Sequence, residues 1–246
     1  MASNTFDFKQ FSIQQDRCAM KVGTDGVLLG AWATATASTQ QVLDIGTGTG
    51  VVALLLAQRL TEAGAHWHTH AVEIDPAAAQ QAQENVAASP WSGHIEVFAT
   101  SLSRFADEPA SAHLYDLIVS NPPFYNATLK PKDSGRAIAR HKDSLPIDEI
   151  TRFARTHLSE GGRLALIYPT AYDGEVMQAA VLSGLKPVRI CDILTRVGKV
   201  AKRRMAELAL STAQVSHETL AIRGEDGRYT PEYRLLTEDF YLRLTD

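Results

Sequence analysis

The tetrapeptide Asn121-Pro122-Pro123-Phe124 directly follows the apolar run 117–120 and offers two fixed acceptors beside an aromatic ring. An exocyclic amine is a poor nucleophile because its lone pair is delocalised, so a catalyst of its methylation must draw that pair back onto nitrogen. The Asn121 side-chain oxygen and the Pro122 carbonyl would do this by accepting N–H bonds, and consecutive prolines fix φ without supplying competing donors. Phe124 would stack on the substrate plane. The tetrapeptide therefore indicates methylation of a planar nitrogen, although a stiff turn after a buried strand also explains it.

The segment Asp44-Ile45-Gly46-Thr47-Gly48-Thr49-Gly50 follows an apolar run and opens a helical pattern. In a doubly wound sheet this turn binds nucleotide-like ligands, and glycine lets the backbone approach them closely. The spacing is Gly-x-Gly-x-Gly rather than the Gly-x-Gly-x-x-Gly of dinucleotide-binding proteins. The Asp44 carboxylate would repel a pyrophosphate but suits a ligand that carries an ammonium and a sulfonium. The segment therefore indicates S-adenosylmethionine as the cofactor, although glycines also form tight turns that bind no ligand.

Two residues at the end of the next apolar strand fit the same cofactor. Glu73 offers the acceptor that ribose hydroxyls require. Ile74 would cover one face of the adenine, unless it packs in the core. The glycine turn contributes to this expected cofactor site Asp44, Gly46, Thr47, Gly48 and Gly50, and the tetrapeptide contributes Asn121.

From Gln41 onward, apolar segments rich in β-branched residues alternate with helical patterns, which is typical of βαβ units. The expected strands are residues 42–45, 71–74, 95–99, 117–120, 164–168, 188–194 and 207–211, and the expected helices are residues 51–60, 77–88, 147–157 and 171–183. Thr230 followed by Pro231 predicts the start of a short final helix. Near-continuous apolar strands fit a parallel sheet with both faces covered. The sequence therefore predicts an α/β fold with a Rossmann-like, doubly wound, mostly parallel sheet.

No repeat or flexible linker divides the 246 residues, so we expect one domain with an N-terminal decoration (1–40), a core (41–212) and a C-terminal extension (213–246). A content of 45% hydrophobic and 21% charged residues is ordinary for a soluble globular protein. No segment has the apolar length of a membrane span, and the N-terminus does not resemble a signal peptide. We therefore expect a cytoplasmic protein that binds no membrane, and no obligate protein partner is evident.

The cysteines and histidines do not predict a metal site. Cys18 and Cys191 lie far apart without metal-ligand spacing, so we expect both to be buried small hydrophobes. The segment His66-Trp67-His68-Thr69-His70 places three histidines on one side of an extended strand, but no fixed carboxylate or cysteine partner is apparent. We expect this segment to be a polar entrance to a strand, with Trp67 packed beneath it, and we expect no bound metal.

The chain resembles the class I S-adenosylmethionine-dependent methyltransferases, and more closely the bacterial tRNA1(Val) (adenine-N6)-methyltransferases. Besides the two motifs above, the stretches that carry the resemblance are residues 8–11, 20–32, 139–141 and 229–242. The resemblance thus runs almost end to end. It implies a class I methyltransferase fold, S-adenosylmethionine as cofactor, and methylation of adenine N6 at position 37, beside the tRNA anticodon. It also implies that residues 21–25 lie near the methionine end of the cofactor, with Thr24 as a contact.

One residue departs from the family pattern. Where the family usually has an aspartate after the third strand to receive the adenine amine of the cofactor, this chain has Ser101. A hydroxyl accepts that hydrogen bond more weakly than a carboxylate does. By the resemblance, adenine recognition here rests on Ser101 and on the backbone N–H of Leu102.

Two basic segments follow expected strands at the carboxyl edge of the sheet, where they could contact phosphates. The expected RNA-binding residues are Lys130, Lys132, Arg136, Arg140 and His141 in the first segment, and Lys199, Lys202, Arg203 and Arg204 in the second. The net charge of −4 argues against non-specific coating of nucleic acid, but a local basic face still binds tRNA. Charge runs are also common on solvated faces.

Two other functions fit parts of the sequence. A glutamine methyltransferase acting on a translation release factor also uses Asn-Pro-Pro and an aromatic residue to hold a carboxamide. Such enzymes carry a preceding helical domain, for which the roughly forty residues before the first expected strand leave no room. A non-catalytic module that binds cofactor and RNA would not need Asn121, Pro122 and Phe124 intact. From the residues alone, acceptor geometry permits adenine N6, guanine N2, cytosine N4 or glutamine.

Overall fold

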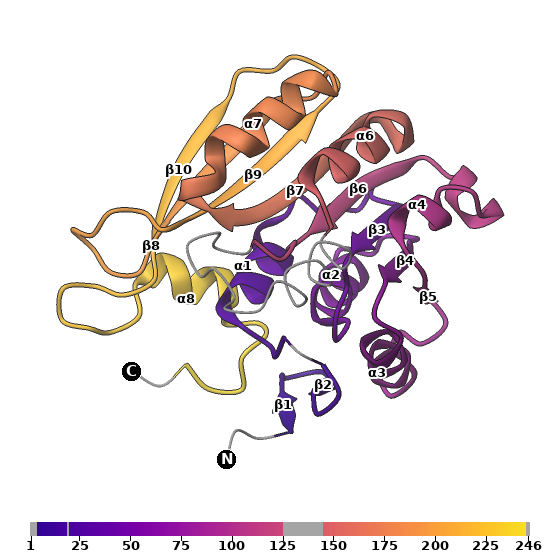
Figure 1. The fold of residues 1–246 in the computed structure, drawn as a ribbon. Coiled ribbons are helices and arrows are strands. Elements are labelled where there is room, and N and C mark those ends of the chain that lie inside the picture. The colour runs from indigo at the N-terminus through magenta and orange to yellow at the C-terminus, as the bar shows by residue number, and fades with distance from the viewer. Residues whose placement is uncertain (1–3, 19, 125–144, 245–246) are drawn as a thin grey trace, which may run out of the picture.

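A computed structural model describes residues 4–18, 20–124 and 145–244 (Figure 1). The strands are β1 (Thr5–Asp7), β2 (Ser12–Gln14), β3 (Gln41–Ile45), β4 (His68–Glu73), β5 (Ile95–Ala99), β6 (Tyr115–Ser120), β7 (Leu158–Pro169), β8 (Lys186–Leu194), β9 (Arg203–Ala209) and β10 (Ser216–Ala221). The helices are α1 (Thr24–Trp32), α2 (Val51–Glu62), α3 (Pro76–Ala87), α4 (Leu102–Phe105), α6 (Ile147–His157), α7 (Asp173–Leu182) and α8 (Pro231–Thr237), with short 3-10 helices η1 (Pro109–Ala112) and η2 (Thr170–Tyr172).

Eight strands form one sheet in the order β10-β8-β9-β7-β6-β3-β4-β5. Neighbouring strands pair in parallel except β9, which runs antiparallel between β7 and β8. The α/β fold and the mostly parallel sheet predicted from the sequence are therefore confirmed. The order also brings the carboxyl ends of β3 and β6 together as neighbours, which places the glycine turn and the tetrapeptide at the same edge.

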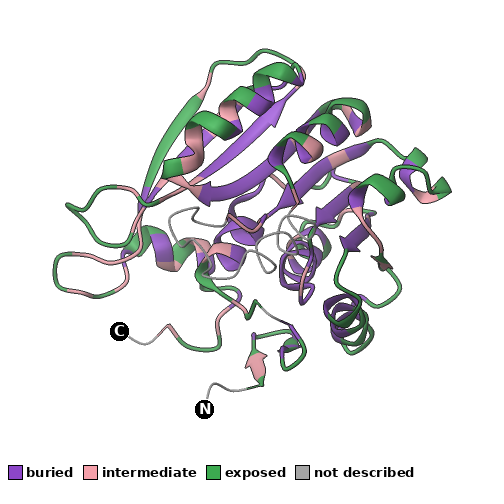
Figure 2. Cartoon of the chain, in the orientation of Figure 1, coloured by how far each residue is buried: buried purple, intermediate pink, exposed green. Residues whose placement is uncertain are grey.

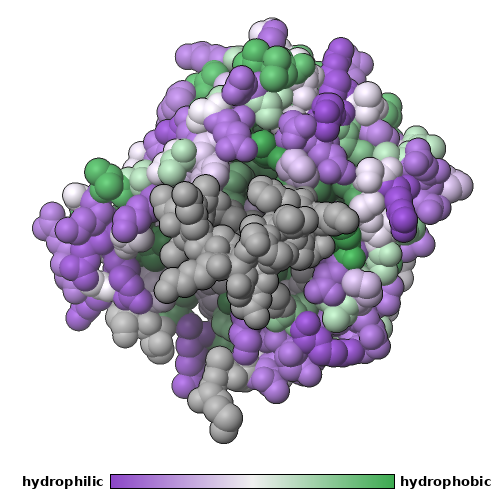
Figure 3. Space-filling model, in the orientation of Figure 1, coloured by the Kyte–Doolittle hydropathy of each residue, from purple (hydrophilic) through white to green (hydrophobic). Residues whose placement is uncertain are grey.

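Helices cover both faces of the sheet, and each face has its own apolar core (Figure 2). One core contains α1, α2 and α8, and the other contains α4, α6 and α7. Alternate residues of β3 divide between them, since Val42 belongs to the first core and Leu43 and Ile45 to the second. Both faces of the central strands are thus buried, which explains their near-continuous apolar sequences. On the face seen in Figure 3, hydrophilic residues dominate the outline of the molecule.

The segments before β3 and after β10 pack against each other. Phe8 lies in the turn between β1 and β2 and forms an antiparallel bridge with Tyr241, and its ring stacks on Phe11 and Tyr241. Figure 1 shows the β1–β2 hairpin and α8 on the same side of the sheet. No helix in residues 4–18, 20–124 and 145–244 is both long and apolar enough to cross a membrane.

The bounds predicted from the sequence for β5 and α6 are confirmed, whereas the prediction was incomplete for β9 and β10. β9 begins at Arg203, four residues before the expected strand at 207. β10, in the stretch expected to be an extension, pairs with β8 as the edge strand. Its residues are mostly exposed, so its sequence lacks the apolar pattern that marks the central strands. Cys18 and Cys191 are both buried free thiols, as expected.

The final helix begins as predicted. Thr230 caps α8 by accepting a hydrogen bond from the Tyr233 backbone N–H, and Pro231 is the first helical residue. The N–H of the first helical residue has no acceptor within the helix, so its absence in Pro231 costs no hydrogen bond. The fixed φ of proline also suits the first turn.

Candidate active site

A cleft of about 430 Å³ opens at the carboxyl ends of β3, β6 and β7. The glycine turn after β3 and the tetrapeptide after β6 both line it. Of the predicted site residues, the cleft is lined by Thr24, Asp44, Gly46, Thr47, Gly48, Asn121, Pro122, Pro123 and Phe124. A cavity of this size is within the usual range for small-molecule sites. Two motifs that are more than seventy residues apart in the sequence therefore share one space.

The glycine turn requires left-handed backbone at three positions. Gly46, Gly48 and Gly50 have φ angles of 72°, 57° and 84°, a region that side chains with a Cβ rarely adopt. The turn is tied to the neighbouring strand because the Gly46 N–H donates to the Val72 carbonyl at 2.8 Å. Gly50 then caps α2, whose amino end points toward the cleft side of the sheet.

Asp44 is 1% exposed, and one of its oxygens holds the turn to the helix. Oδ2 accepts from the Thr47 hydroxyl at 2.6 Å and from the Ala53 backbone N–H at 3.2 Å. Burial raises the pKa of the Asp44 carboxyl to about 7, although the two hydrogen bonds lower it in part. Both donors are neutral. A cationic group bound in the cleft would therefore supply the positive charge that this carboxylate lacks.

Glu73 ends β4 and fixes the turn from the other side. Its Oε2 accepts from the Gly48 N–H at 2.8 Å, and its Oε1 accepts from the Asp75 N–H at 3.0 Å. Each carboxylate oxygen has a second lone pair, so these bonds leave acceptor capacity for a ligand hydroxyl. Ile74 next to it is 49% exposed, which excludes the alternative that it packs in the core.

Ser101 follows β5 at the same edge of the sheet but does not line the cleft. Its hydroxyl accepts from the Arg104 backbone N–H at 3.3 Å and thereby caps α4, and it lies 3.0 Å from the Ser103 hydroxyl. Leu102 is the first residue of α4, and its side chain is buried. Ala99 at the end of β5 pairs with Glu73 at the end of β4. Ser101 and Leu102, which follow β5, therefore lie one strand farther from the cleft than Glu73.

The tetrapeptide stands beside two aromatic residues that the sequence analysis did not assign to the site. The Phe124 ring centroid is 5.0 Å from that of Tyr172 and 6.1 Å from that of Tyr168. The Tyr168 hydroxyl donates to Asp173 at 3.0 Å, and burial raises the pKa of this phenol above its ordinary value. Tyr168 therefore keeps its proton and is not a base. Immediately before Asn121, the Ser120 hydroxyl donates to the Ile45 carbonyl at 2.8 Å and joins the two cleft strands.

Arg203 lines the cleft and forms an ion pair with Asp25, with Nε 2.8 Å from Oδ2. This pair connects β9 to the first turn of α1 across the rim. Arg203 was predicted only as an RNA contact, because its strand was expected to begin later. Met20, Lys21 and Asp25 also line the cleft.

Apart from Arg203, the predicted basic residues divide into three groups. Lys199 and Lys202 are exposed in the loop between β8 and β9. Arg204 forms ion pairs with Asp173 and Asp192, each at 2.8 Å, so its guanidinium is engaged with carboxylates of the protein. Lys130, Lys132, Arg136, Arg140 and His141 lie outside the described residues.

Comparisons with known proteins agree with this geometry. Residues 22–189 match the family described as the methyltransferase small domain. A tRNA1(Val) (adenine(37)-N6)-methyltransferase of Parabacteroides distasonis is 42% identical, covering 99% of this chain and all of that protein. One of Flavobacterium johnsoniae is 44% identical over 97% of this chain and all of that protein.

Among solved structures, a predicted O-methyltransferase of Agrobacterium tumefaciens superposes with a TM-score of 0.65 at 20% identity, covering 88% of this chain and 96% of that one. At that identity the likeness concerns the fold alone, which is that of the class I methyltransferases. The full-length similarity to the curated relatives goes further, since it spans the glycine turn, the tetrapeptide and both termini. The chain belongs to the tRNA1(Val) (adenine(37)-N6)-methyltransferase family.

Proposed function

We propose that this protein transfers a methyl group from S-adenosylmethionine to the N6 amine of adenine 37 in tRNA1(Val). The observation that carries the proposal is the single cleft that joins the glycine turn to the Asn121-Pro122-Pro123-Phe124 loop. Full-length relatives with this named activity support the choice of base and of tRNA. A protein with this substrate acts in the cytoplasm.

The lining of the cleft supports binding of the cofactor by Thr24, Asp44, Gly46, Thr47 and Gly48. Beyond the lining, at the same edge of the sheet, we also assign to cofactor binding Gly50, Glu73, Ile74, Ser101 and Leu102. Asp44 would face the ammonium, the glycine turn would let the backbone approach the ligand, and Glu73 would accept from the ribose. When bound, S-adenosylmethionine supplies an electrophilic methyl group on a sulfonium.

The protein's part in the reaction is to prepare and position the amine. Asn121 and the Pro122 carbonyl accept its two N–H bonds, which pulls the nitrogen away from planarity and frees its lone pair. The proline pair holds both acceptors without reorganisation during the reaction. Phe124 stacks on the flipped base, next to Tyr172. No strong base is required, because the amine loses a proton only after it has become positively charged.

Replacing Phe124 with alanine is expected to weaken capture of the base. Stacking on an aromatic side chain contributes roughly 1–3 kcal/mol per base, which is about 5- to 150-fold in affinity. We expect KM for tRNA to rise within this range, while the Kd for S-adenosylmethionine stays the same. Phe124→Tyr, which keeps the ring, is the matched control and should retain the wild-type KM. An unchanged KM in the alanine variant would show that Phe124 does not stack on the base.

Replacing Ser101 with aspartate is expected to tighten cofactor binding. Aspartate is as good a helix N-cap as serine, so the cap on α4 is retained, and a carboxylate accepts the adenine amine more strongly than a hydroxyl. A charge-assisted bond exceeds a neutral one by about 1 kcal/mol, so Kd should fall roughly fivefold by calorimetry. Ser101→Asn keeps the cap without the charge and should leave Kd near wild type. A weaker Kd in the aspartate variant would show that adenine does not reach this position.

The exposed lysines of the β8–β9 loop, Lys199 and Lys202, are the described residues best placed to contact tRNA phosphates, because Arg203 at the end of that loop lines the cleft. Arg203 would contact phosphates on the cleft side of the loop. Arg204 is instead held by its ion pairs with Asp173 and Asp192. We assign the phosphate contacts of the second basic segment to the lysines and to Arg203.

The proposed function is tested with methyl-labelled S-adenosylmethionine and unmodified tRNA1(Val) transcript. Digestion to nucleosides should give labelled N6-methyladenosine, and a transcript with guanine at position 37 should give none. A translation release factor is offered in a parallel reaction. Label in that protein alone, or in a nucleoside other than N6-methyladenosine, would refute the assignment.

A further inference from the structure

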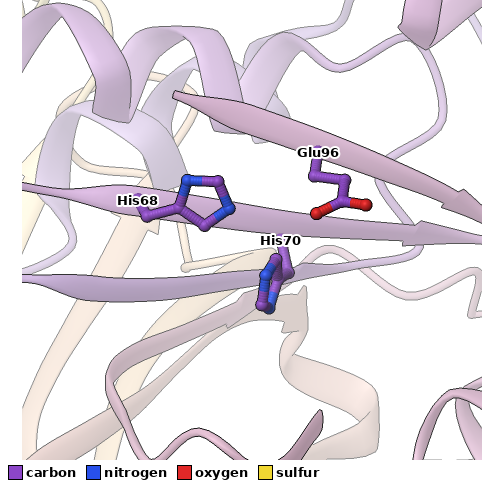
Figure 4. Close-up of side chains that lie close together, drawn as sticks. All are labelled: His68, His70 and Glu96. Carbon is purple, nitrogen blue, oxygen red and sulfur yellow. The ribbon is translucent and has the colours of Figure 1, made fainter. Parts of the chain in front are cut away.

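Two histidines and a glutamate gather at the amino end of β4, away from the cleft (Figure 4). His68 and His70 are two residues apart on β4, so their side chains share one face of the sheet. Glu96 lies on the edge strand β5 and pairs directly with His70 in the strand register. One ligand atom from each of the three residues falls within 4.8 Å of the others. The carboxylate that the sequence analysis found lacking is therefore supplied by the neighbouring strand.

The orientation of His70 is fixed by a second layer of contacts. Its Nδ1 lies 2.8 Å from the Tyr115 hydroxyl, and that hydroxyl donates to the Ala110 carbonyl at 3.5 Å. The contact with the Tyr115 hydroxyl holds the His70 ring in one orientation. A ring nitrogen held by such an outer partner is typical of histidines that bind metals.

Packing also holds the His70 ring in place. His70 is 3% exposed and packs edge-on against Phe98 and Phe105. The ring therefore has little freedom to rotate.

We propose that His68, His70 and Glu96 form a binding site for a divalent transition metal, with Zn²⁺ as the best match. Two imidazoles and one carboxylate are a ligand set that zinc prefers, and water or a further histidine completes four-fold coordination. His113 is one such histidine, with its ring centroid 5.8 Å from that of His70.

Metal binding requires the ligands to close slightly. Tetrahedral zinc with bonds of 2.0–2.2 Å places ligand atoms about 3.4 Å apart, which is closer than the 4.8 Å limit of the free site. Glu96 is exposed and His68 is half-buried, so both have room to rotate toward the fixed His70 ring. Buried His70 thus fixes the position of the metal, and the more accessible His68 and Glu96 complete its coordination.

The site lies at the opposite end of β4 from Glu73, so the metal takes no part in methyl transfer. It would instead join β4 to β5, which is an edge strand and has β4 as its only neighbour among the strands that the structure describes. The metal therefore stabilises this edge of the fold.

The test is calorimetric titration of the untagged, chelator-treated protein with Zn²⁺ alone. Wild type should bind one equivalent saturably and should melt at a higher temperature when zinc is present. Glu96→Gln and His68→Gln each remove one ligand from an accessible position and should weaken binding at least tenfold. His217→Gln, on the distant β10, is the matched control and should bind zinc as wild type does. Buried His70 is left unchanged.

Two further measurements keep the test independent of folding and of catalysis. S-adenosylhomocysteine should bind both ligand variants with wild-type affinity, which verifies that they are folded. Co²⁺ should give the intense visible absorption of tetrahedral coordination in wild type, and that absorption should be lost in Glu96→Gln. Absence of saturable zinc binding by wild type, or equal binding by all the variants, would overturn the proposal.

Discussion

Asn121→Ala is expected to lower kcat by about 10²–10³-fold, the typical loss when one preorganised hydrogen-bonding partner of a transition state is removed. The lost acceptor acts on the amine that attacks, so the rate of the chemical step falls and the Kd for S-adenosylmethionine stays nearly the same. The rate is best measured in a single turnover with saturating enzyme, which separates methyl transfer from tRNA release.

Asn121→Asp provides the matched control for this experiment. Aspartate has the same shape and keeps an acceptor oxygen at the same place, so it should retain much more activity than alanine. If alanine instead weakens cofactor binding as strongly as it slows turnover, Asn121 serves the cofactor and not the amine. Loss of activity in both variants to the same degree would also contradict an acceptor role.

Asp44→Asn is expected to weaken cofactor binding by roughly 10- to 150-fold at pH 8, because a contact with a charged partner contributes about 1.5–3 kcal/mol. The substitution is structurally mild. The hydrogen bonds from Thr47 and Ala53 both go to Oδ2, so an asparagine oxygen at that position accepts both. Calorimetry gives the Kd. An unchanged Kd would show that this carboxylate does not face the ammonium.

The same residue makes cofactor affinity depend on pH. Burial raises the pKa of Asp44 to about 7 in the free protein, so below that pH a proton must leave before the cationic ligand binds. Affinity of the wild type should therefore fall by up to tenfold per unit as pH drops from 7 to 5.5, where the ligand amine stays protonated. Asp44→Asn should show no such slope.

Stability should change in the opposite sense. A carboxyl whose folded pKa is raised reduces stability as pH rises from its unfolded value of about 4 to about 7, because only the unfolded state ionises freely in that window. At pH 8 the wild type bears this full cost. Without cofactor, Asp44→Asn should accordingly melt at a higher temperature than wild type at pH 8, and the difference should shrink toward pH 4.

The parts of the site that local sequence could predict are those that follow a buried strand directly. Asp44 and the glycines follow β3, Glu73 ends β4, and Asn121 follows β6. Each stands at the carboxyl end of an apolar run, and parallel strands bring those ends together. That Asp44, the glycine turn and Asn121 share a cleft was therefore predictable from periodicity and the chemistry of a few residues.

The residues whose place in the cleft was not predicted depend on long-range pairing. Tyr168 lines the cleft because β7 pairs with β6, and Arg203 lines it because β9 inserts between β7 and β8 in the reverse direction. No local pattern specifies that insertion. The cluster of His68, His70 and Glu96 also depends on long-range pairing. The pairing of β4 with β5 places Glu96 opposite His70, twenty-six residues away in the sequence.

β9 lies between β7 and β8 in the sheet, although the chain is synthesised through both of those strands before β9 emerges. Until then β7 has an open edge, and open edges promote aggregation. Arg203 is both the first residue of β9 and part of the cleft wall. A growing chain on the ribosome thus acquires this part of its cleft wall in the same step that closes the gap in its sheet.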